Sequence, residues 1–158
     1  MNTVSTIQVV KLKDVCRIRY GKDYRRLEKG DIPCYGSGGV YAHVGQSLSA
    51  KKSVLIPRKG TLTNLFLVEP PFWAVDTIFW TEIDENLILP EFLFYSLSMK
   101  NLQSMNSGTA VPSLTSAHLY EMKITLPPIS VQQSMCSCLT ILDEKIKLNK
   151  TINHHLFI

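Results

Sequence analysis

The chain has 158 residues, of which 45% are hydrophobic and 19% are charged, and its formal net charge is +4. This length favours one globular domain with an appendage, and the composition allows a buried core. The sequence has no apolar run long enough to span a membrane, its N-terminus lacks the basic flank and apolar centre of a secretory signal, and its four cysteines are unevenly spaced. We therefore expect a cytoplasmic protein with reduced thiols and no membrane partner.

The charge is unevenly distributed along the chain. Residues 1–60 hold twelve Lys and Arg against four Asp and Glu, a net charge of +8, whereas residues 61–158 hold five against nine, a net charge of −4. A basic block within a modestly basic protein is the electrostatic footprint expected for a polyanion. Nucleic acid is therefore favoured as a partner over the alternative of a solvated basic face without a ligand.

The first half of the chain predicts short strands separated by polar loops. Asp14 is expected to cap a single helical turn, and the basic loop at 21–26 includes one aromatic ring, which suits phosphates and a sugar or base. Glycines at 36, 38 and 39 permit a tight turn, but the β-prone residues after them argue against a phosphate cradle, which should lead into a helix. Strands are expected at 9–12, 40–44 and 66–68, and over 53–61 a buried strand that runs into a basic turn.

The second half mixes strands with helices. Strand formers at 72–80 include Trp and Phe side chains that are expected in the core rather than as platforms for stacked bases. Pro90 suits the first turn of an amphipathic helix that would end near Asn106. A short helix around 117–119 and a strand at 122–126 are expected next. Strands and helices that follow one another without regular alternation predict an α+β fold.

A long coiled-coil-type helix is expected after the two prolines that end this last strand. Ser130 is its expected N-cap, and Gln133 is placed to complete a capping box. The chain is thus expected to divide into a globular domain, 1–128, and a helix that pairs with another helix, 129–158. The helix carries a stripe with the spacing of a coiled-coil seam, which one helix cannot bury alone. The residues of this seam are Met135, Leu139, Leu142, Ile146, Asn149 and Asn153.

Two alternatives bear on that seam. A second stripe, Ile141, Leu148 and Ile152, competes for the interface, and the two asparagines could instead face solvent. In the seam, asparagines would cost stability while fixing register and orientation.

Enzymatic chemistry has weaker support. The segment 69–73, Glu-Pro-Pro-Phe-Trp, is similar to the base-holding loop of amino-methyltransferases and, with 35–39, suggests a minimal adenine methyltransferase. Its first residue is Glu rather than Asn, Asp or Ser, and the chain is short for that fold, so a Pro-Pro turn between strands is favoured. The Cys, His and acidic residues lack the spacing of zinc ligands or of a metal-dependent nuclease. No catalytic residue, metal ligand or cofactor is predicted.

Several short motifs occur in a specific order. They are Lys11–Asp14, Gly21-Lys22, Ile32–Gly39, Leu55–Gly60, Asp76-Thr77, Gly108–Leu114, Leu126–Pro128, Gln132-Gln133 and Leu142–Ile146. As an ordered set they resemble the target recognition domain, with its following conserved helix, of the specificity subunit of type I restriction-modification systems.

The resemblance implies a non-catalytic subunit that binds one half of a split double-stranded DNA target and directs methyltransferase and restriction subunits to it. A full-length subunit of this family carries two recognition domains spaced by two antiparallel helices. This chain carries one recognition domain and one such helix. We therefore expect a homodimer, or pairing with a second chain that carries a recognition domain. A module that uses the helix to bind protein and never touches DNA stays open as an alternative.

The positions that match the family supply the candidate DNA contacts. Those expected to contact phosphates are Lys22, Arg25, Arg26, Lys51 and Lys52. Those expected nearest the base edges are Tyr35, Ser37, Arg58, Lys59, Thr61 and Asn64.

Overall fold

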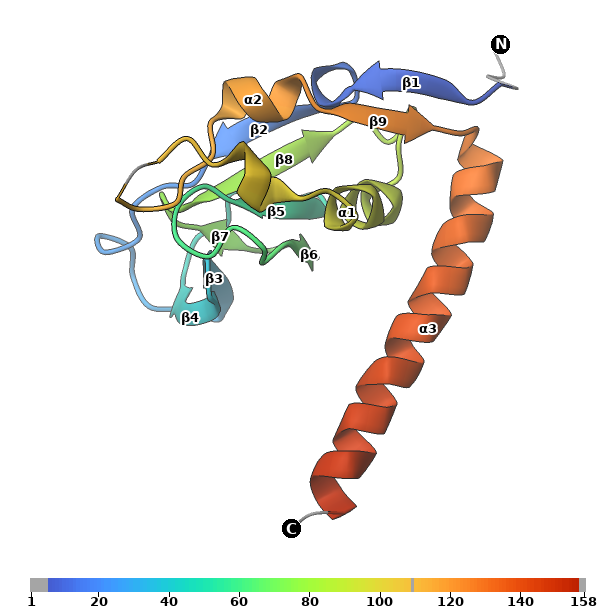
Figure 1. Cartoon of the computed structure of the whole chain (residues 1–158). Coiled ribbons are helices and arrows are strands. Elements are labelled where there is room, and N and C mark those ends of the chain that lie inside the picture. The colour runs from blue at the N-terminus through green and yellow to red at the C-terminus, as the bar shows by residue number, and fades with distance from the viewer. Residues whose placement is uncertain (1–5, 109, 157–158) are drawn as a thin grey trace.

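A body of small sheets and short helices carries one long helix that extends away from it (Figure 1). The structure is a computed structural model that describes residues 6–108 and 110–156, the last two of them by their backbone alone. The mixture of strands and helices confirms the predicted α+β class and the long C-terminal helix. The elements are β1 (Gln8–Lys11), η1 (Leu12–Asp14), β2 (Cys16–Tyr20), β3 (Ile32–Gly36), β4 (Gly39–Val44), β5 (Ser53–Pro57), β6 (Phe66–Val68), β7 (Trp73–Ala74), β8 (Ile78–Ile83), α1 (Pro90–Ser98), η2 (Leu102–Met105), α2 (Ser116–Tyr120), β9 (Lys123–Leu126) and α3 (Ile129–Leu156).

Three sheets organise the body. The largest is antiparallel, has the order β2-β8-β5-β6, and places Tyr20 opposite Phe79 and Pro57 opposite Ile78. β1 pairs with β9, and the hairpin of β3 and β4 adds β7 in parallel. All residues of β5 are buried, because this strand lies inside the largest sheet and both of its faces are covered.

Neighbouring residues of β8 reach two different cores. Phe79 shares one core with Leu93 of α1, and Trp80 shares the other with Phe72. Successive side chains of a strand point to opposite faces, so the pair shows that the sheet is packed on both sides. Phe72, Trp73, Phe79 and Trp80 are all buried, which confirms that these aromatic residues belong to the core.

The first predicted helical turn is wrong. Asp14 closes the short 3-10 turn η1 instead of opening a turn, and its carboxylate accepts the N–H of Lys11 at 2.8 Å. The residues after it, including Ile18, form strand β2, whose alternation of buried and exposed side chains suits the edge of the largest sheet.

The helix that begins at Pro90 is shorter than predicted. It ends at Ser98, and Met99, which lies within the predicted range, is 88% exposed. The side chain of Asn101 accepts the N–H of Ser104 and starts the separate turn η2. Such a local hydrogen bond competes with helix continuation, which explains why the apolar pattern alone overextended the helix.

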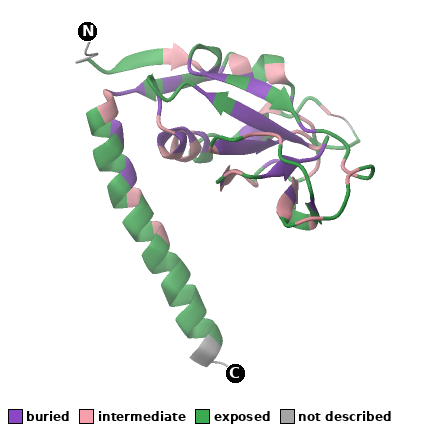
Figure 2. Cartoon of the chain, turned by 180° about the vertical axis from the view of Figure 1, so that it is seen from behind, coloured by how far each residue is buried: buried purple, intermediate pink, exposed green. Residues whose placement is uncertain are grey.

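The long helix begins without the predicted capping box. Its first residue is Ile129, so Ser130 lies inside the first turn, and Gln133 is exposed. The neighbouring Gln132 is fully buried and bonds the preceding segments of the body. Beyond its first turns most of the helix is exposed (Figure 2). In the described part of the chain, neither this helix nor any other is long and apolar enough to cross a membrane.

Candidate nucleic-acid interface

Loops from distant parts of the chain meet at the end of the largest sheet that lies away from α3 (Figure 1). There β2 and β5 end and β8 begins, so their connecting loops emerge side by side. The N–H of Arg58 donates to the carbonyl oxygen of Thr77 at 2.8 Å, and the N–H of Gly21 donates to that of Ile78 at 2.9 Å. We call these loops, residues 20–26, 36–39, 57–64, 75–77, 106–108 and 110–116, the loop cluster.

Arg58 contacts three other loops of this cluster. Its Nη1 donates to the carbonyl oxygen of Asp76 at 3.1 Å, and its Cζ lies 5.1 Å from the centroid of the Tyr20 ring. The carbonyl oxygen of Arg58 accepts the N–H of Leu114 at 2.8 Å. Both the backbone and the guanidinium of Arg58 are therefore fixed, while the side chain stays only half-buried.

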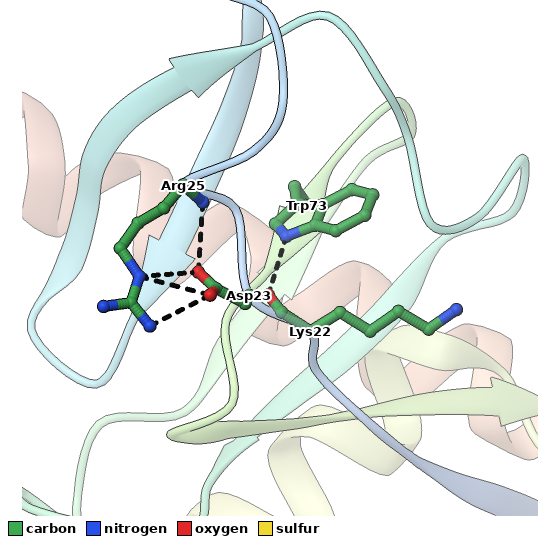
Figure 3. A network of polar contacts seen from close by, with 4 residues as sticks. All are labelled: Lys22, Asp23, Arg25 and Trp73. Atoms are coloured by element: carbon green, nitrogen blue, oxygen red, sulfur yellow. Dashed lines mark hydrogen bonds and ion pairs between the residues drawn. The ribbon is translucent and has the colours of Figure 1, made fainter.

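The basic loop after β2 is anchored through its backbone (Figure 3). Lys22 donates its N–H to the carbonyl oxygen of Ala74 at 2.9 Å and accepts from Nε1 of Trp73 at 3.0 Å. The side chain of Lys22 extends away from these contacts and is exposed. The β7 strand thus fixes the loop while its cation stays available.

An ion pair fixes the next turn of this loop (Figure 3). Arg25 donates from Nε to both carboxylate oxygens of Asp23 and from Nη2 to Oδ2 at 2.9 Å. These hydrogen bonds lower the pKa of Asp23 to about 2 and raise that of Arg25. Because the pair is exposed, a phosphate could compete with the carboxylate for the guanidinium.

The turn between β3 and β4, residues 36–39, approaches the loop after β5 at two points. Asn64 donates from Nδ2 to the carbonyl oxygen of Ser37 at 2.9 Å. Gly60 adopts a φ of +89°, and a Cβ at this position would lie 3.1 Å from Oγ of Ser37. A side chain there would be both strained and crowded, so glycine permits the close approach of the two loops.

The described residues of the motif at 108–114 are held by hydrogen bonds next to Arg58. Oδ1 of Asn106 accepts the N–H groups of Gly108 and Ser113 at 2.9 and 2.8 Å. A Cβ on Gly108 would lie 2.0 Å from the carbonyl oxygen of Val111, which leaves room for glycine alone. Thr109 of this motif lies outside the described residues. The motif therefore has a structural task, because Leu114 at its end bonds the backbone of Arg58.

The structure brings together most of the predicted contact residues. The loop cluster holds Lys22, Arg25, Arg26, Ser37, Arg58, Lys59, Thr61 and Asn64. Tyr35 lies beside it, half-buried, with its ring centroid 5.8 Å from that of Phe66.

Two predicted contacts lie elsewhere. Lys51 and Lys52 precede β5, whereas Arg58 follows it, so the length of the strand separates them. Nζ of Lys52 lies 2.6 Å from Oε1 of Glu69 and 2.5 Å from Oε1 of Glu91. Hydrogen bonds to Glu69 and then Glu91 raise the pKa of Lys52. A phosphate contact at this residue would have to replace two ion pairs.

Ion pairs also account for part of the basic block. Lys11 and Lys13 pair with Glu121, and Arg19 pairs with Glu82. Residues 6–108 and 110–156 include no group of three His, Cys, Asp or Glu side chains that could hold a metal ion. Over the same ranges, Lys22, Arg26, Lys51, Arg58 and Lys59 form no ion pair.

The sequence did not indicate three residues that support the site. They are Tyr20, whose ring contacts Arg58, Asp76, whose carbonyl oxygen accepts from Arg58, and Ser116, which contacts Tyr20. Oη of Tyr20 lies 3.2 Å from Oγ of Ser116, and its ring stands edge-on to Phe79 at a centroid distance of 5.0 Å. These contacts join segments that lie far apart in the chain, through the pairing of β2 with β8 and through the start of α2. The basic residues could be found from local composition, but their supports could not.

The long helix presents a second candidate surface. Along the predicted seam, Met135, Leu142 and Ile146 are 46%, 54% and 50% exposed. A largely apolar groove of about 440 Å³ lies between α1 and α3, and Met135 and Leu139 line it, so the seam continues into this groove. Residues of the competing stripe, Ile141, Leu148 and Ile152, are also exposed.

Comparison with known proteins identifies relatives over nearly the whole chain. The family model described as type I restriction modification DNA specificity domain matches residues 4–156. A Haemophilus influenzae protein assigned as a type I restriction enzyme specificity subunit is 27% identical over 168 aligned positions, which cover 94% of this chain and 43% of that protein. The EcoprrI specificity subunit of Escherichia coli is 27% identical over 109 positions, covering 68% of this chain and 27% of that protein.

Solved structures show the same fold. The S subunit of a type I restriction-modification system from M. genitalium superposes with a TM-score of 0.77 at 13% identity, over 93% of this chain and 41% of that one. The HsdS subunit of Thermoanaerobacter tengcongensis gives a TM-score of 0.68 at 16% identity, over 94% and 40%. This chain therefore spans less than half the length of these two subunits.

Proposed function

The chain belongs to the family of type I restriction-modification DNA specificity domains, and on this premise we propose that it binds one half of a bipartite double-stranded DNA target. The match over residues 4–156 is the observation that carries the proposal. The recognition unit would comprise residues 1–128, and residues 129–158 would serve for pairing and docking. The module itself would perform no catalysis and need no cofactor. It would direct modification subunits to the target, and restriction subunits would join through the modification subunits.

The loop cluster is the proposed DNA-binding surface. Free cations on neighbouring loops suit the backbone of a duplex, and the exposed Lys22 and Arg26 would contact phosphates and set the register. Arg25 would exchange its carboxylate partner for a phosphate. Contacts of Lys51 and Lys52 remain predictions, and at Lys52 they require the loss of two ion pairs.

Base reading is proposed for the loop after β5. Arg58 presents a planar guanidinium, of the kind that bonds O6 and N7 of guanine together, and Lys59 and Thr61 are exposed beside it. Ser37 lies where the hairpin turn meets this loop. Tyr35 packs beside Phe66, and the side-chain amide of Asn64 donates to the carbonyl oxygen of Ser37. We therefore propose that Tyr35 and Asn64 shape the surface.

The long helix is proposed to pair with a second copy of the chain, or with another chain that carries a recognition domain. Two copies related by a two-fold axis would present identical domains and so bind an interrupted palindrome. The seam that includes Leu142 and Ile146 would lie between the helices, with Asn149 and Asn153 fixing their register.

The second apolar stripe of the helix is proposed as the docking site for modification subunits. Ile141 and Leu142 are adjacent, so they lie about 100° apart around the helix axis. One partner helix that covers the seam leaves the stripe of Ile141, Leu148 and Ile152 exposed. Two apolar faces on one helix thus suit two partners.

Selection from randomised duplex DNA tests this function. The full chain, assembled with its modification subunit, would be incubated with a random library at about 150 mM salt, and the retained DNA would be sequenced. We expect enrichment of a few defined base pairs, repeated as an inverted copy if the chain is a homodimer. Retention of DNA without any sequence preference would contradict a specificity function. Affinity that does not change with salt would contradict phosphate contacts, and would favour a module that binds protein alone.

A further inference from the structure

We infer that Tyr20 is a positioning residue for Arg58, and that the ring of Tyr20 is needed for discrimination at the base pair that Arg58 reads. This inference rests on the proposed function, because it concerns how the loop cluster reads DNA. It assigns a role to a side chain that would touch neither phosphate nor base itself.

The guanidinium of Arg58 is held on two sides. Its Cζ lies 5.1 Å from the centroid of the Tyr20 ring, within the range of a cation–π contact. Its Nη1 donates to the carbonyl oxygen of Asp76 at 3.1 Å. Among the described residues no further hydrogen bond engages the side chain of Arg58, so most of its five N–H donors remain available to a ligand.

The backbone beneath this side chain is equally constrained. The N–H of Arg58 donates to the carbonyl oxygen of Thr77, and the carbonyl oxygen of Arg58 accepts the N–H of Leu114, each at 2.8 Å. The next residue but one, Gly60, donates to the carbonyl oxygen of Pro112 at 3.0 Å. Pro112 and Leu114 therefore hold the backbone of this loop, while Tyr20 and Asp76 hold the guanidinium of Arg58.

Tyr20 is itself firmly placed, although it is 51% exposed. It is the last residue of β2 and pairs in register with Phe79, whose ring it meets edge-on at a centroid distance of 5.0 Å. Its hydroxyl lies 3.2 Å from Oγ of Ser116, the first residue of α2. The ring is thus attached to the sheet at its base and to a helix at its tip.

This arrangement matters for reading bases more than for general affinity. A bidentate contact with guanine requires the plane of the guanidinium to be aligned with the base edge, whereas a phosphate accepts a cation from many directions. An arginine that is already oriented loses less side-chain freedom on binding. Removal of the Tyr20 ring should therefore reduce sequence preference and leave the salt dependence of binding unchanged.

A double-mutant cycle tests the inference. The full chain, assembled with its modification subunit, would carry Tyr20→Leu, Arg58→Ala or both, and each would be titrated with the selected duplex and with duplexes altered at single base pairs. We expect Arg58→Ala to reduce discrimination at one base pair by about 5- to 150-fold. Tyr20→Leu should reduce it at the same base pair by about 2- to 30-fold. The double variant should be no worse than Arg58→Ala alone.

Two further variants separate the ring from the hydroxyl and from folding. Tyr20→Phe keeps the ring and should retain most of the discrimination. Tyr41→Leu is a matched control, because this tyrosine is 52% exposed and edge-on to Tyr24, whereas the cation–π contact of Arg58 is with Tyr20. It should change neither base preference nor salt slope. Thermal unfolding would check each variant, and Tyr20→Met would replace Tyr20→Leu if the latter fails to fold.

The outcomes distinguish this inference from the proposed function. If the wild-type complex shows no preference for any duplex, the proposed function fails, and the inference fails with it. If the wild type is selective but Tyr20→Leu keeps full discrimination, or adds its full effect to that of Arg58→Ala, the positioning role is overturned while the DNA-binding function stands.

Discussion

The buried side chain of Gln132 accepts the backbone N–H of Leu89 at 2.9 Å, and this bond fastens the start of α3 to the segment before α1. Nε2 of the same amide donates to the carbonyl oxygens of Leu87 and Pro127 at 3.0 and 2.8 Å. One glutamine thus pairs with three backbone groups. Further along the helix, Asp143 accepts the hydroxyl of Tyr95 at 2.7 Å. The direction in which the helix leaves the body is therefore fixed by polar contacts.

Replacement of Gln132 by alanine should destabilise the chain strongly. It leaves backbone groups without partners in a buried site, at a cost of about 1–3 kcal/mol for each group that water cannot reach. Chemical denaturation of the full chain would measure the loss of unfolding free energy. Gln133→Ala, at the exposed neighbouring position, is the matched control and should stay within about 0.5 kcal/mol of the wild type. Equal stability of the two variants would show that the buried amide does not anchor the helix.

The pair of Asp23 and Arg25 should respond to acid. The pKa of Asp23 in the folded chain, about 2, lies below its ordinary value. The ion pair therefore contributes fully to folding stability above about pH 4, and this contribution is lost as the pH falls toward 2. A carbon-detected NMR titration of the carboxyl group would follow it. In Arg25→Ala the pKa of Asp23 should return toward its ordinary value, because the side-chain hydrogen bonds are gone. An unchanged titration midpoint in that variant would contradict the assigned cause.

Salt dependence should distinguish the two groups of predicted phosphate contacts. Lys22→Ala should reduce the slope of log affinity against log salt by about one, because one phosphate contact is lost. Lys51→Ala, at the other end of β5, tests the second group, which would lower the slope by the same amount only if the DNA reaches that end of the strand. Fluorescence anisotropy with the selected duplex would measure both slopes. A slope reduced only in Lys51→Ala would indicate that the DNA binds at the other end of β5 and not at the loop cluster.

Charge on the helical seam should separate the paired chains. Ile146→Glu would place a charge in a face that is expected to bury isoleucine, which forfeits about 1.5–3 kcal/mol per copy. We therefore expect the dissociation constant of the dimer to rise by more than about 100-fold in sedimentation velocity. Thr151→Glu, on the opposite side of the helix, should leave it unchanged.

The competing stripe needs its own variant. Leu148→Glu should preserve pairing and weaken the binding of modification subunits, since the two stripes are proposed for different partners. Loss of pairing in Leu148→Glu, with pairing kept in Ile146→Glu, would show that the two stripes have the opposite roles.

Local pattern predicted the parts of the fold that depend on local chemistry. Most strands, the short helix α2 and the long helix follow from alternation, apolar periodicity and the placement of proline. The capping box failed because Ser130 lies within a helix that starts one residue earlier, and the buried Gln132 does the anchoring. Which glutamine is buried depends on how the helix docks against the body, which the local sequence does not contain.

The candidate site shows the same division. The basic and polar residues of the loop cluster were found from composition and motif order. The support of Arg58 by Tyr20 was not, because it arises from the pairing of β2 and β5 with β8. Lys52 was expected to be available, but acids from two other segments neutralise it. Residue type predicts charge, whereas the fold decides which charges remain free.

Competition between two duplexes tests the central claim most directly. The full chain with its modification subunit would be bound to the selected duplex and challenged with a duplex of equal length and composition whose half-site is scrambled. We predict that the selected duplex binds at least about 10³-fold more tightly at physiological salt, and that Arg58→Ala removes a measurable part of this ratio. Equal affinity for the two duplexes would contradict the account, because a chain that binds both alike reads no sequence.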